Sequence, residues 1–359
     1  MPRRMHADEV DVDEPLVRRL LAEQLPGMAG LPMTIVEPWG TDNAIWRLGS
    51  ELVVRLPRIH WATAQVGLEA EWLPRLAPDL PVEVPEPVHV GEPSDDYPYA
   101  WSVHRWVRGG APALEDLDDP VRFAADLARV VSALRRIPTE GAPRARNRAR
   151  PLEEYDVSTR RAIEGAAHLV DAAAARLVWE EALAAEPHTG APVWVHGDLE
   201  GNCLVDGGRL CGVVDWGSAC AGDPAVDVQV VWSPLFTERS RHAFLELLDV
   251  DPSTVLRSRG AALNQACAAL PYYLHTYPEI VHRARHKLRA LGVDVLDGPS
   301  SSSGDPSWRG RRAGRRPGWA HGRRSAPVTA ARRLRAAVVG APRGDRLRAR
   351  ADGHPAPPS

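Results

Sequence analysis

Hydrophobic positions in the first 107 residues follow a helical period at the start and then short runs typical of β-strands. Residues 10–24 place Val17, Leu20 and Leu21 at helical spacing behind acidic residues, which predicts an amphipathic helix with a favourable dipole. A second helix is expected over residues 62–73, with Pro74 as its stop. Strands are expected at residues 34–37, 44–48 and 52–56, and near residues 88–90 and 100–107.

The pattern from residue 108 to residue 297 is mainly helical, with a short β island over residues 193–215. Strands with one helix, then a connector, then a helical mass predict an α+β protein with two lobes and a cleft between them. We expect an N-terminal lobe over residues 1–107, a C-terminal lobe over residues 108–297 and a hinge at residues 106–110. The expected helices of the second lobe cover residues 119–136, 153–185, 223–232, 238–248, 252–276 and 279–291.

Residues 298–359 form a tail rich in Gly, Ser, Pro and Arg, with too little apolar surface to offset the entropy of ordering. We expect this tail to be disordered, with a short helix at residues 330–339 as the one exception. It carries 14 arginines and three acids, so the chain's net charge of −3 leaves residues 1–297 at −14. The acidic body argues against a specific nucleic-acid binder.

Composition excludes several other classes. No run approaches the roughly 18–20 apolar residues of a membrane span, and the N-terminus turns acidic where a secretory signal turns apolar. The four cysteines show neither a CxxC pair nor metal-ligand spacing, so we interpret them as packing residues. We therefore expect a cytoplasmic protein without a membrane partner, as a monomer or a weak dimer.

Candidate chemistry concentrates in residues 193–227, VWVHGDLEGNCLVDGGRLCGVVDWGSACAGDPAVD. Asp198 follows a strand-like run, Asn202 comes four residues later, and Asp215 ends the run CGVVD. A hairpin of residues 203–205 and 211–214 would bring Asn202 and Asp215 to the same end, beside Asp198. Oxygen ligands from Asn and Asp suit Mg²⁺, which keeps several waters and takes few carboxylates. Asp198 then stays available as a base.

HGDLEGN followed by VVDWGSACAGDPAVD resembles the aminoglycoside phosphotransferase family, which has the protein kinase-like fold. WGTDNAIWRLGSELVVRLPR is similar to that family's nucleotide loop and third strand, and YAWSVHRWVRG is similar to its hinge. The resemblance covers roughly residues 15–295 in the family's order. It implies a bilobal kinase-like fold, with ATP and Mg²⁺ as cofactors and a small-molecule hydroxyl as acceptor. Asp198 would be the catalytic aspartate, with Asn202 and Asp215 as the Mg²⁺ ligands.

The resemblance also assigns the nucleotide side. Arg55 falls where protein kinases carry the phosphate-pairing lysine, and Glu69 would be its partner, with Glu71 as the alternative on another helix face. The assignment agrees with composition, because Lys287 is the chain's single lysine and arginine offers a fixed charged fork to phosphate. Backbone groups near Trp106 would meet the adenine. The loop holds one glycine, so Thr41 and Asn43 are the candidate donors to phosphate.

Several features depart from the family's pattern or have a structural alternative. The spacing from Asp198 to Asn202 is four where five is usual, so Glu200 is an alternative ligand for metal or acceptor. Asp223 is expected to cap a helix before Pro224 and Asp227 to face the catalytic loop. His196 is expected to brace the loop and not to act as a base.

We therefore expect an ATP- and Mg²⁺-dependent phosphotransferase acting on an aminoglycoside or a comparable hydroxylated metabolite. One alternative is a kinase of another metabolite, such as a macrolide, a choline-like compound or an amino sugar, since it shares every motif. A second alternative is a nucleotide-binding pseudokinase that acts as an interaction module. Protein kinase activity is disfavoured because the HRD, DFG and APE elements are absent from the sequence.

Overall fold

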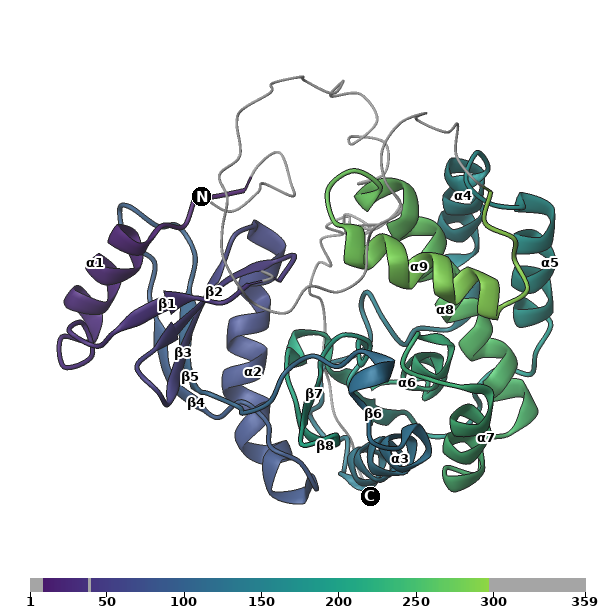
Figure 1. Cartoon of the computed structure of the whole chain (residues 1–359), viewed down its shortest axis with the longest axis horizontal. Coiled ribbons are helices and arrows are strands. Elements are labelled where there is room, and N and C mark those ends of the chain that lie inside the picture. Colours follow the sequence, from purple (N-terminus) through teal and green to yellow (C-terminus); the bar gives the residue numbers. More distant parts are fainter. Residues whose placement is uncertain (1–8, 38–39, 297–359) are drawn as a thin grey trace, which may run out of the picture.

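The computed structural model describes residues 9–37 and 40–296, so the tail at 298–359 and its expected disorder lie outside the described residues. The N-terminal lobe is a five-stranded antiparallel sheet in the order β1-β2-β3-β5-β4, with helix α1 on one side and α2 on the other (Figure 1). Its elements are α1 (Glu14–Gln24), β1 (Met33–Ile35), β2 (Asn43–Leu48), β3 (Leu52–Pro57), α2 (Thr63–Leu76), β4 (Pro87–Gly91) and β5 (Trp101–Arg105).

The two faces of this sheet have different chemistry. Strand residues alternate between faces, so Val54 and Val103 pack with the buried face of α1. Arg55 and its cross-strand neighbours lie on the opposite face, because β3 pairs Arg55 with Ser102 and Val53 with His104. The alternation therefore puts a cation and a buried histidine on the face away from α1.

Helix α2 joins the two lobes. Glu69 is buried on it, and further along the helix Trp72 and Leu73 belong to the core of the C-terminal lobe. The expectation that Pro74 stops this helix is wrong, because α2 continues to Leu76. A proline in the last turn removes a single backbone bond, and the burial of Leu76 in the same core outweighs that loss.

The C-terminal lobe is mainly helical (Figure 1) and also contains two short antiparallel strand pairs, β6 with β9 and β7 with β8. One large apolar core holds it together, and three of its tryptophans, Trp179, Trp194 and Trp216, are among the largest fully buried side chains of the described residues. Its elements are α3 (Pro120–Arg136), α4 (Asp156–Ala166), α5 (Ala172–Leu183), β6 (Val193–Val195), β7 (Cys203–Asp206), β8 (Arg209–Val213), β9 (Cys220–Gly222), α6 (Ala225–Val228), α7 (Glu238–Leu247), α8 (Pro252–Tyr273) and α9 (Pro278–Ala290).

Two boundaries differ from the sequence-based expectation. The single helix expected over residues 153–185 is two helices, because Asp171 accepts hydrogen bonds from the amides of Ala173 and Ala174 and so begins α5. The β island extends to Gly222, since the three-residue strand β9 pairs with β6. The predicted α+β class, with a sheet in the N-terminal part and a mainly helical C-terminal part, is confirmed. No helix in the described part of the chain is long and apolar enough to cross a bilayer.

Candidate active site

The loop that follows β6 carries Asp198, and the buried carboxylate of Asp227 binds the backbone of this loop. Asp227 accepts hydrogen bonds from the amides of His196 at 2.9 Å and Gly197 at 2.8 Å. Gly197 has φ +81, a conformation that glycine adopts without strain. Burial raises the pKa of Asp227, while the nearby His196 and the two amides oppose that rise. Asp227 thus faces the loop, as expected, and fixes its backbone.

His196 braces the same loop. Its Nδ1 accepts the amide hydrogen of Asp198 at 3.2 Å, so the ring proton is on Nε2, which donates to the carbonyl of Val214 at 3.1 Å. The imidazole is fully buried and packs edge-on against Trp216. Both ring nitrogens are engaged with backbone, whereas the Asp198 side chain is 38% exposed. Asp198, and not His196, therefore presents the accessible base.

The β7–β8 hairpin brings the two candidate metal ligands toward Asp198. Cys203 pairs with Val213, and just beyond this pair the amide of Val214 donates to the carbonyl of Asn202 at 2.9 Å. Asn202 in turn donates from Nδ2 to the carbonyl of Asp198 at 2.7 Å, which leaves its Oδ1 as the ligand atom. Asp215 follows in a left-handed conformation, with φ 60 and ψ 65. The four-residue spacing therefore still places Asn202 against the Asp198 loop.

Arg55 lies between two carboxylates, one from each lobe. Its Nη1 is 2.5 Å from Glu69 on α2 and its Nη2 is 2.8 Å from Asp215. Although burial opposes its charge, the two carboxylates raise the pKa of Arg55 above its usual value. Burial also raises the pKa of Glu69, an effect that Arg55 opposes. Glu71 is exposed and lies near Arg75, so Glu69 is the residue of this helix that meets Arg55.

Of the remaining candidates for nucleotide binding, Asn43 and Trp106 form hydrogen bonds within the chain. The buried Asn43 donates from Nδ2 to Gln65 at 3.4 Å, and the half-buried Thr41 precedes it. The Trp106 amide donates to the carbonyl of Glu51 at 2.9 Å, and the Arg47 guanidinium lies 4.6 Å from the Trp106 ring centroid. Thr41 is thus the less encumbered donor of the loop.

The donor set fits Mg²⁺ bound together with a nucleotide. No group of three or more His, Cys, Asp or Glu side chains in residues 9–37 and 40–296 could hold a metal by itself. Asn202 and Asp215 offer one amide oxygen and one carboxylate that is 45% exposed. Mg²⁺ commonly takes one or two carboxylates and completes its shell with waters and phosphates. These two residues therefore suit a metal that arrives with the substrate.

Glu200, in the shortened loop between Asp198 and Asn202, forms a buried ion pair. Glu200 lies 2.5 Å from Lys287 of α9, with side chains 13% and 4% exposed. Lys287 also donates to Gln265 at 3.1 Å. Glu200 is therefore committed to the chain's single lysine and is poorly placed as a free metal ligand. Sequence reasoning missed Lys287, although a lone lysine in an arginine-rich chain was a signal that could have been followed.

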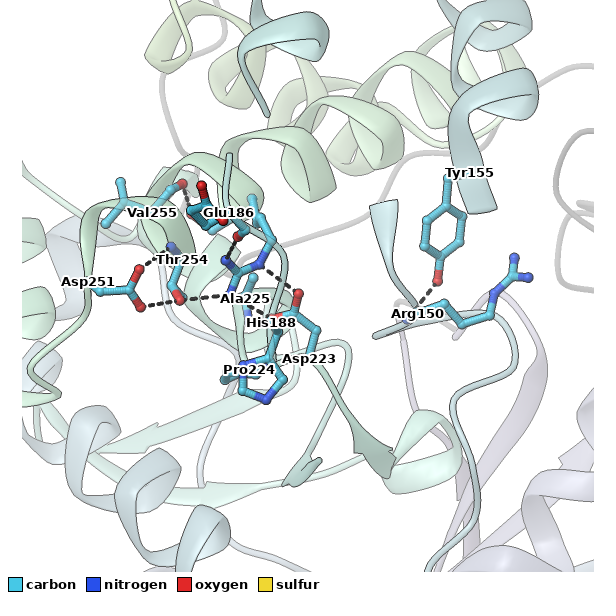
Figure 2. Close-up of polar contacts among 12 residues, drawn as sticks. Arg150, Tyr155, Glu186, His188, Asp223, Pro224, Ala225, Asp251, Thr254 and Val255 are labelled. Atoms are coloured by element: carbon cyan, nitrogen blue, oxygen red, sulfur yellow. Dashed lines mark hydrogen bonds and ion pairs between the residues drawn. The ribbon is translucent and has the colours of Figure 1, made fainter. Parts of the chain in front are cut away.

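Asp223 belongs to a polar network between α8 and the start of α6 (Figure 2). It accepts from the Ala225 amide at 2.9 Å, as expected of a cap, and from Arg257 Nε at 2.8 Å. Arg257, which sequence reasoning did not single out, also donates to Thr254 at 2.8 Å. Thr254 then donates to Asp251, the residue that caps α8, at 2.5 Å. This network joins α8 to the start of the helix that carries Asp227.

The sheet, the helical lobe and the carboxylates between them define a protein of the kinase-like phosphotransferase class. The profile of the phosphotransferase enzyme family (APH) matches residues 36–262, which is more than half of the chain. The chain therefore belongs to this family, and the resemblance drawn from its motifs is confirmed. A comparison with curated protein sequences finds no significant match.

Solved structures of related enzymes share the fold. The complex of APH(2")-IIia with GDP and kanamycin has a TM-score of 0.64 at 18% identity, covering 78% of this chain and 99% of that chain. Macrolide 2'-phosphotransferase type I has a TM-score of 0.55 at 21% identity, covering 78% and 98%. ADP-bound aminoglycoside phosphotransferase APH(2'')-Ib has a TM-score of 0.52 at 15% identity, again covering 78% and 98%.

Proposed function

We propose that this protein transfers the γ-phosphoryl group of ATP to a hydroxyl of a small molecule, in an Mg²⁺-dependent reaction. The observation that carries the proposal is the exposed Asp198 carboxylate next to Asn202, with Asp215 held by Arg55 at 2.8 Å. Phosphoryl transfer asks a protein mainly to position two oxygens and to neutralise phosphate charge. The assembly supplies a base, a cation and two metal ligands.

In the proposed mechanism, Asp198 orients the acceptor hydroxyl and takes its proton. The acceptor oxygen bonds to the γ-phosphorus, the bond from that phosphorus to the β,γ-bridging oxygen breaks, and ADP leaves. Arg55 offsets phosphate charge while Glu69 keeps its guanidinium in place. Mg²⁺, held by Asn202 and Asp215, would supply further neutralisation of the phosphates. Thr41 would donate a hydrogen bond to phosphate, and the backbone near Trp106 would border the adenine ring.

The acceptor is the open part of the proposal. The related solved structures include a kanamycin complex and a macrolide 2'-phosphotransferase, and those names support aminoglycosides and macrolides as acceptors to test. Hydroxylated metabolites complete the set. The GDP and ADP complexes of related enzymes support a purine nucleotide as donor.

The test is Mg²⁺-dependent release of ADP from ATP across aminoglycosides, macrolides and small hydroxylated metabolites. Asp198→Asn should lower acceptor-stimulated turnover by about 10²–10⁴-fold, because it removes the base and leaves the shape. Asp206→Asn, an exposed carboxylate on the same hairpin, is the matched control and should stay at wild-type activity. ATP-dependent stabilisation without turnover of any acceptor would favour a pseudokinase, and the absence of any effect of ATP would contradict the kinase proposal.

A further inference from the structure

A second arginine of the site lies near the Asp198 carboxylate, whereas Arg55 contacts Asp215. Arg148 lies with Nη2 3.8 Å from Asp198 Oδ2, and its side chain is 30% exposed. Among the described residues no hydrogen bond from its guanidinium is found, so most of its five N–H donors remain for a ligand. A strong charge-assisted bond spans about 2.7–2.9 Å, so this contact is a loose one.

The backbone fixes the place of Arg148. It belongs to the arginine loop, residues 143–150, whose start and end are tied to β9: Ala221 donates to Pro143 and Asp223 to Ala149, both at 2.9 Å. Gly222 permits this approach, because a Cβ there would lie 2.5 Å from the carbonyl of Ala149. The amide of Arg150 further donates to the hydroxyl of Tyr155 at 3.2 Å (Figure 2). Arg148 is therefore held beside Asp198 by its neighbours and not only by the carboxylate.

A third arginine covers the other end of the same catalytic loop. Arg283 of α9 donates from Nη1 to the carbonyl of Glu200 at 3.4 Å. Its guanidinium fills the space that a side chain on Gly201 would need, since a Cβ there would meet Nη1 at 2.0 Å. The short loop thus has Arg148 at its beginning and Arg283 at its end.

Two tyrosines connect these arginines. The rings of Tyr273 and Tyr277 meet edge to face, with centroids 6.4 Å apart. Burial is the main cause that raises the pKa of Tyr273, and Asp198 and Arg148 are both close enough to act on it. Tyr277 interacts with Arg283 in the same way. Tyr273, at the end of α8, lies near Arg148, and Tyr277, just before α9, lies near Arg283, so we call this pair of rings the tyrosine wall of the two arginines.

The carboxylates of the site are already partnered. Asp215 binds Arg55, Glu200 binds Lys287, and Asp227 accepts from backbone amides. Asp42 and Glu279 also act on the two tyrosines, but a cationic group bound next to Asp198 would meet Arg148. The net charge of −14 on residues 1–297 attracts cations over long distances, but salt screens it beyond a Debye length of about 8 Å. The local charges decide what binds next to the base.

We propose that Arg148 and Arg283 form an anion-binding subsite, so that the acceptor carries a carboxylate or a phosphate group near the hydroxyl that is phosphorylated. This inference rests on the proposed function and narrows its acceptor class. The planar guanidinium forks suit both anions, and the tyrosine wall suits the ring or carbon skeleton that bears the hydroxyl. Proton transfer to Asp198 is unchanged by this assignment.

The test uses one scaffold with four charges. Glucose 6-phosphate, glucuronate, glucose and glucosamine are titrated calorimetrically against the full-length protein with Mg²⁺ and a non-hydrolysable ATP analogue, and kanamycin is included as a polycation. At least one anionic sugar should bind ten or more times more tightly than glucosamine, and the two anionic compounds separate a phosphate from a carboxylate preference. Tighter or equal binding of glucosamine or kanamycin, or no binding of either anionic sugar, would overturn the proposal.

Variants separate this subsite from a structural role. Arg148→Met and Arg283→Met should each weaken binding of the preferred anion tenfold or more, with the affinity for the ATP analogue changed less than twofold. Arg148→Lys should restore part of the loss, and Arg146→Met, an exposed arginine of the same loop, should change nothing. Wild-type binding in both Met variants would overturn the subsite.

The failure of the proposed function has its own signature. Thermal stabilisation by Mg²⁺-ATP is measured without any acceptor. Its absence contradicts the phosphotransferase, whereas its presence together with a cationic acceptor preference contradicts only the anion subsite.

Discussion

On the proposed nucleotide side of the site, Arg55 lies between two carboxylates at 2.5 and 2.8 Å, whereas on the proposed acceptor side Arg148 lies 3.8 Å from a single carboxylate. The side chain of Arg55 is 10% exposed and that of Arg148 is 30% exposed. A pair removed from water leaves a large penalty when one partner is lost, while an exposed pair contributes little to stability. Arg55, in the proposed nucleotide half, is thus built into the fold, whereas Arg148, in the proposed acceptor half, keeps its charge available for a ligand.

Among the variants that test this difference, substitution of Arg55 should change the free energy of unfolding most. Arg55→Met leaves Glu69, 2% exposed, without its cation, and should lower the free energy of unfolding by about 3–5 kcal/mol. Because burial raises the pKa of Glu69 and Arg55 no longer opposes that rise, the folded variant binds a proton more readily. The deficit should therefore shrink as the pH falls, as urea unfolding at several pH values would measure.

The matched control for Arg55→Met is the double variant that also carries Glu69→Gln. Neutralising the buried carboxylate should recover at least half of the lost stability, since no uncompensated charge remains. A loss below about 1 kcal/mol in Arg55→Met, or no recovery in the double variant, would mean that the pair is not part of the fold's stability.

The positions that share a motif could be predicted from sequence, whereas their partners from distant elements could not. Asp198, Asn202 and Asp215 are close in the chain and meet through one hairpin, which turn signals and hydrophobic alternation predict. Glu69 needed the family register, because a helix pattern alone does not say which of two glutamates faces the strand. Tertiary packing of α2 decides this choice.

Arg148, Arg283 and Lys287 illustrate what the sequence does not reveal. Each meets the catalytic loop from an element far along the chain, and an arginine in a loop or on a basic helix is usually a solvated charge. The break within residues 153–185 and the continuation of α2 past Pro74 have the same origin, since a cap and a buried leucine outweighed the local propensity. Local patterns predicted the elements, and packing determined their ends and neighbours.

Substitution of Lys287 should have an intermediate effect on stability, because Lys287 forms a buried ion pair with Glu200 in the proposed acceptor half. Lys287→Met should lower the free energy of unfolding by roughly 3 kcal/mol, the lower end of the range for such pairs, since Glu200 at 13% exposure can regain some water. Loosening of the loop should also lower kcat more than it changes the KM for ATP. Steady-state kinetics and urea unfolding together measure both effects.

The double variant Glu200→Gln with Lys287→Met is the control for the buried pair. It should regain most of the stability, because both charges are gone. If it regains stability but not kcat, the pair positions the catalytic loop. If Lys287→Met alone behaves as wild type, the ion pair is dispensable for both stability and catalysis.

The smallest of the expected effects is the pH dependence of stability that His104 contributes, and it concerns the proposed nucleotide half alone. Burial, aided by the Arg55 charge, lowers the pKa of His104 from 6.5 to about 3. Between these values the unfolded chain binds a proton that the folded protein rejects, so stability is complete above pH 6.5 and falls as the pH drops. From pH 7 to pH 5 the loss should be about 2 kcal/mol.

His104→Leu should remove that acid sensitivity and leave the stability at pH 7 equal or higher, because both ring nitrogens of His104 are buried without a hydrogen-bond partner among the described residues. Urea unfolding followed by tryptophan fluorescence at pH 7 and pH 5 measures the difference. His60→Gln, at an exposed position of the same lobe, should keep the wild-type response to acid. If His104→Leu loses as much stability at pH 5 as the wild type does, the acid-sensitive group lies elsewhere, and the nucleotide half is not the region that titrates first.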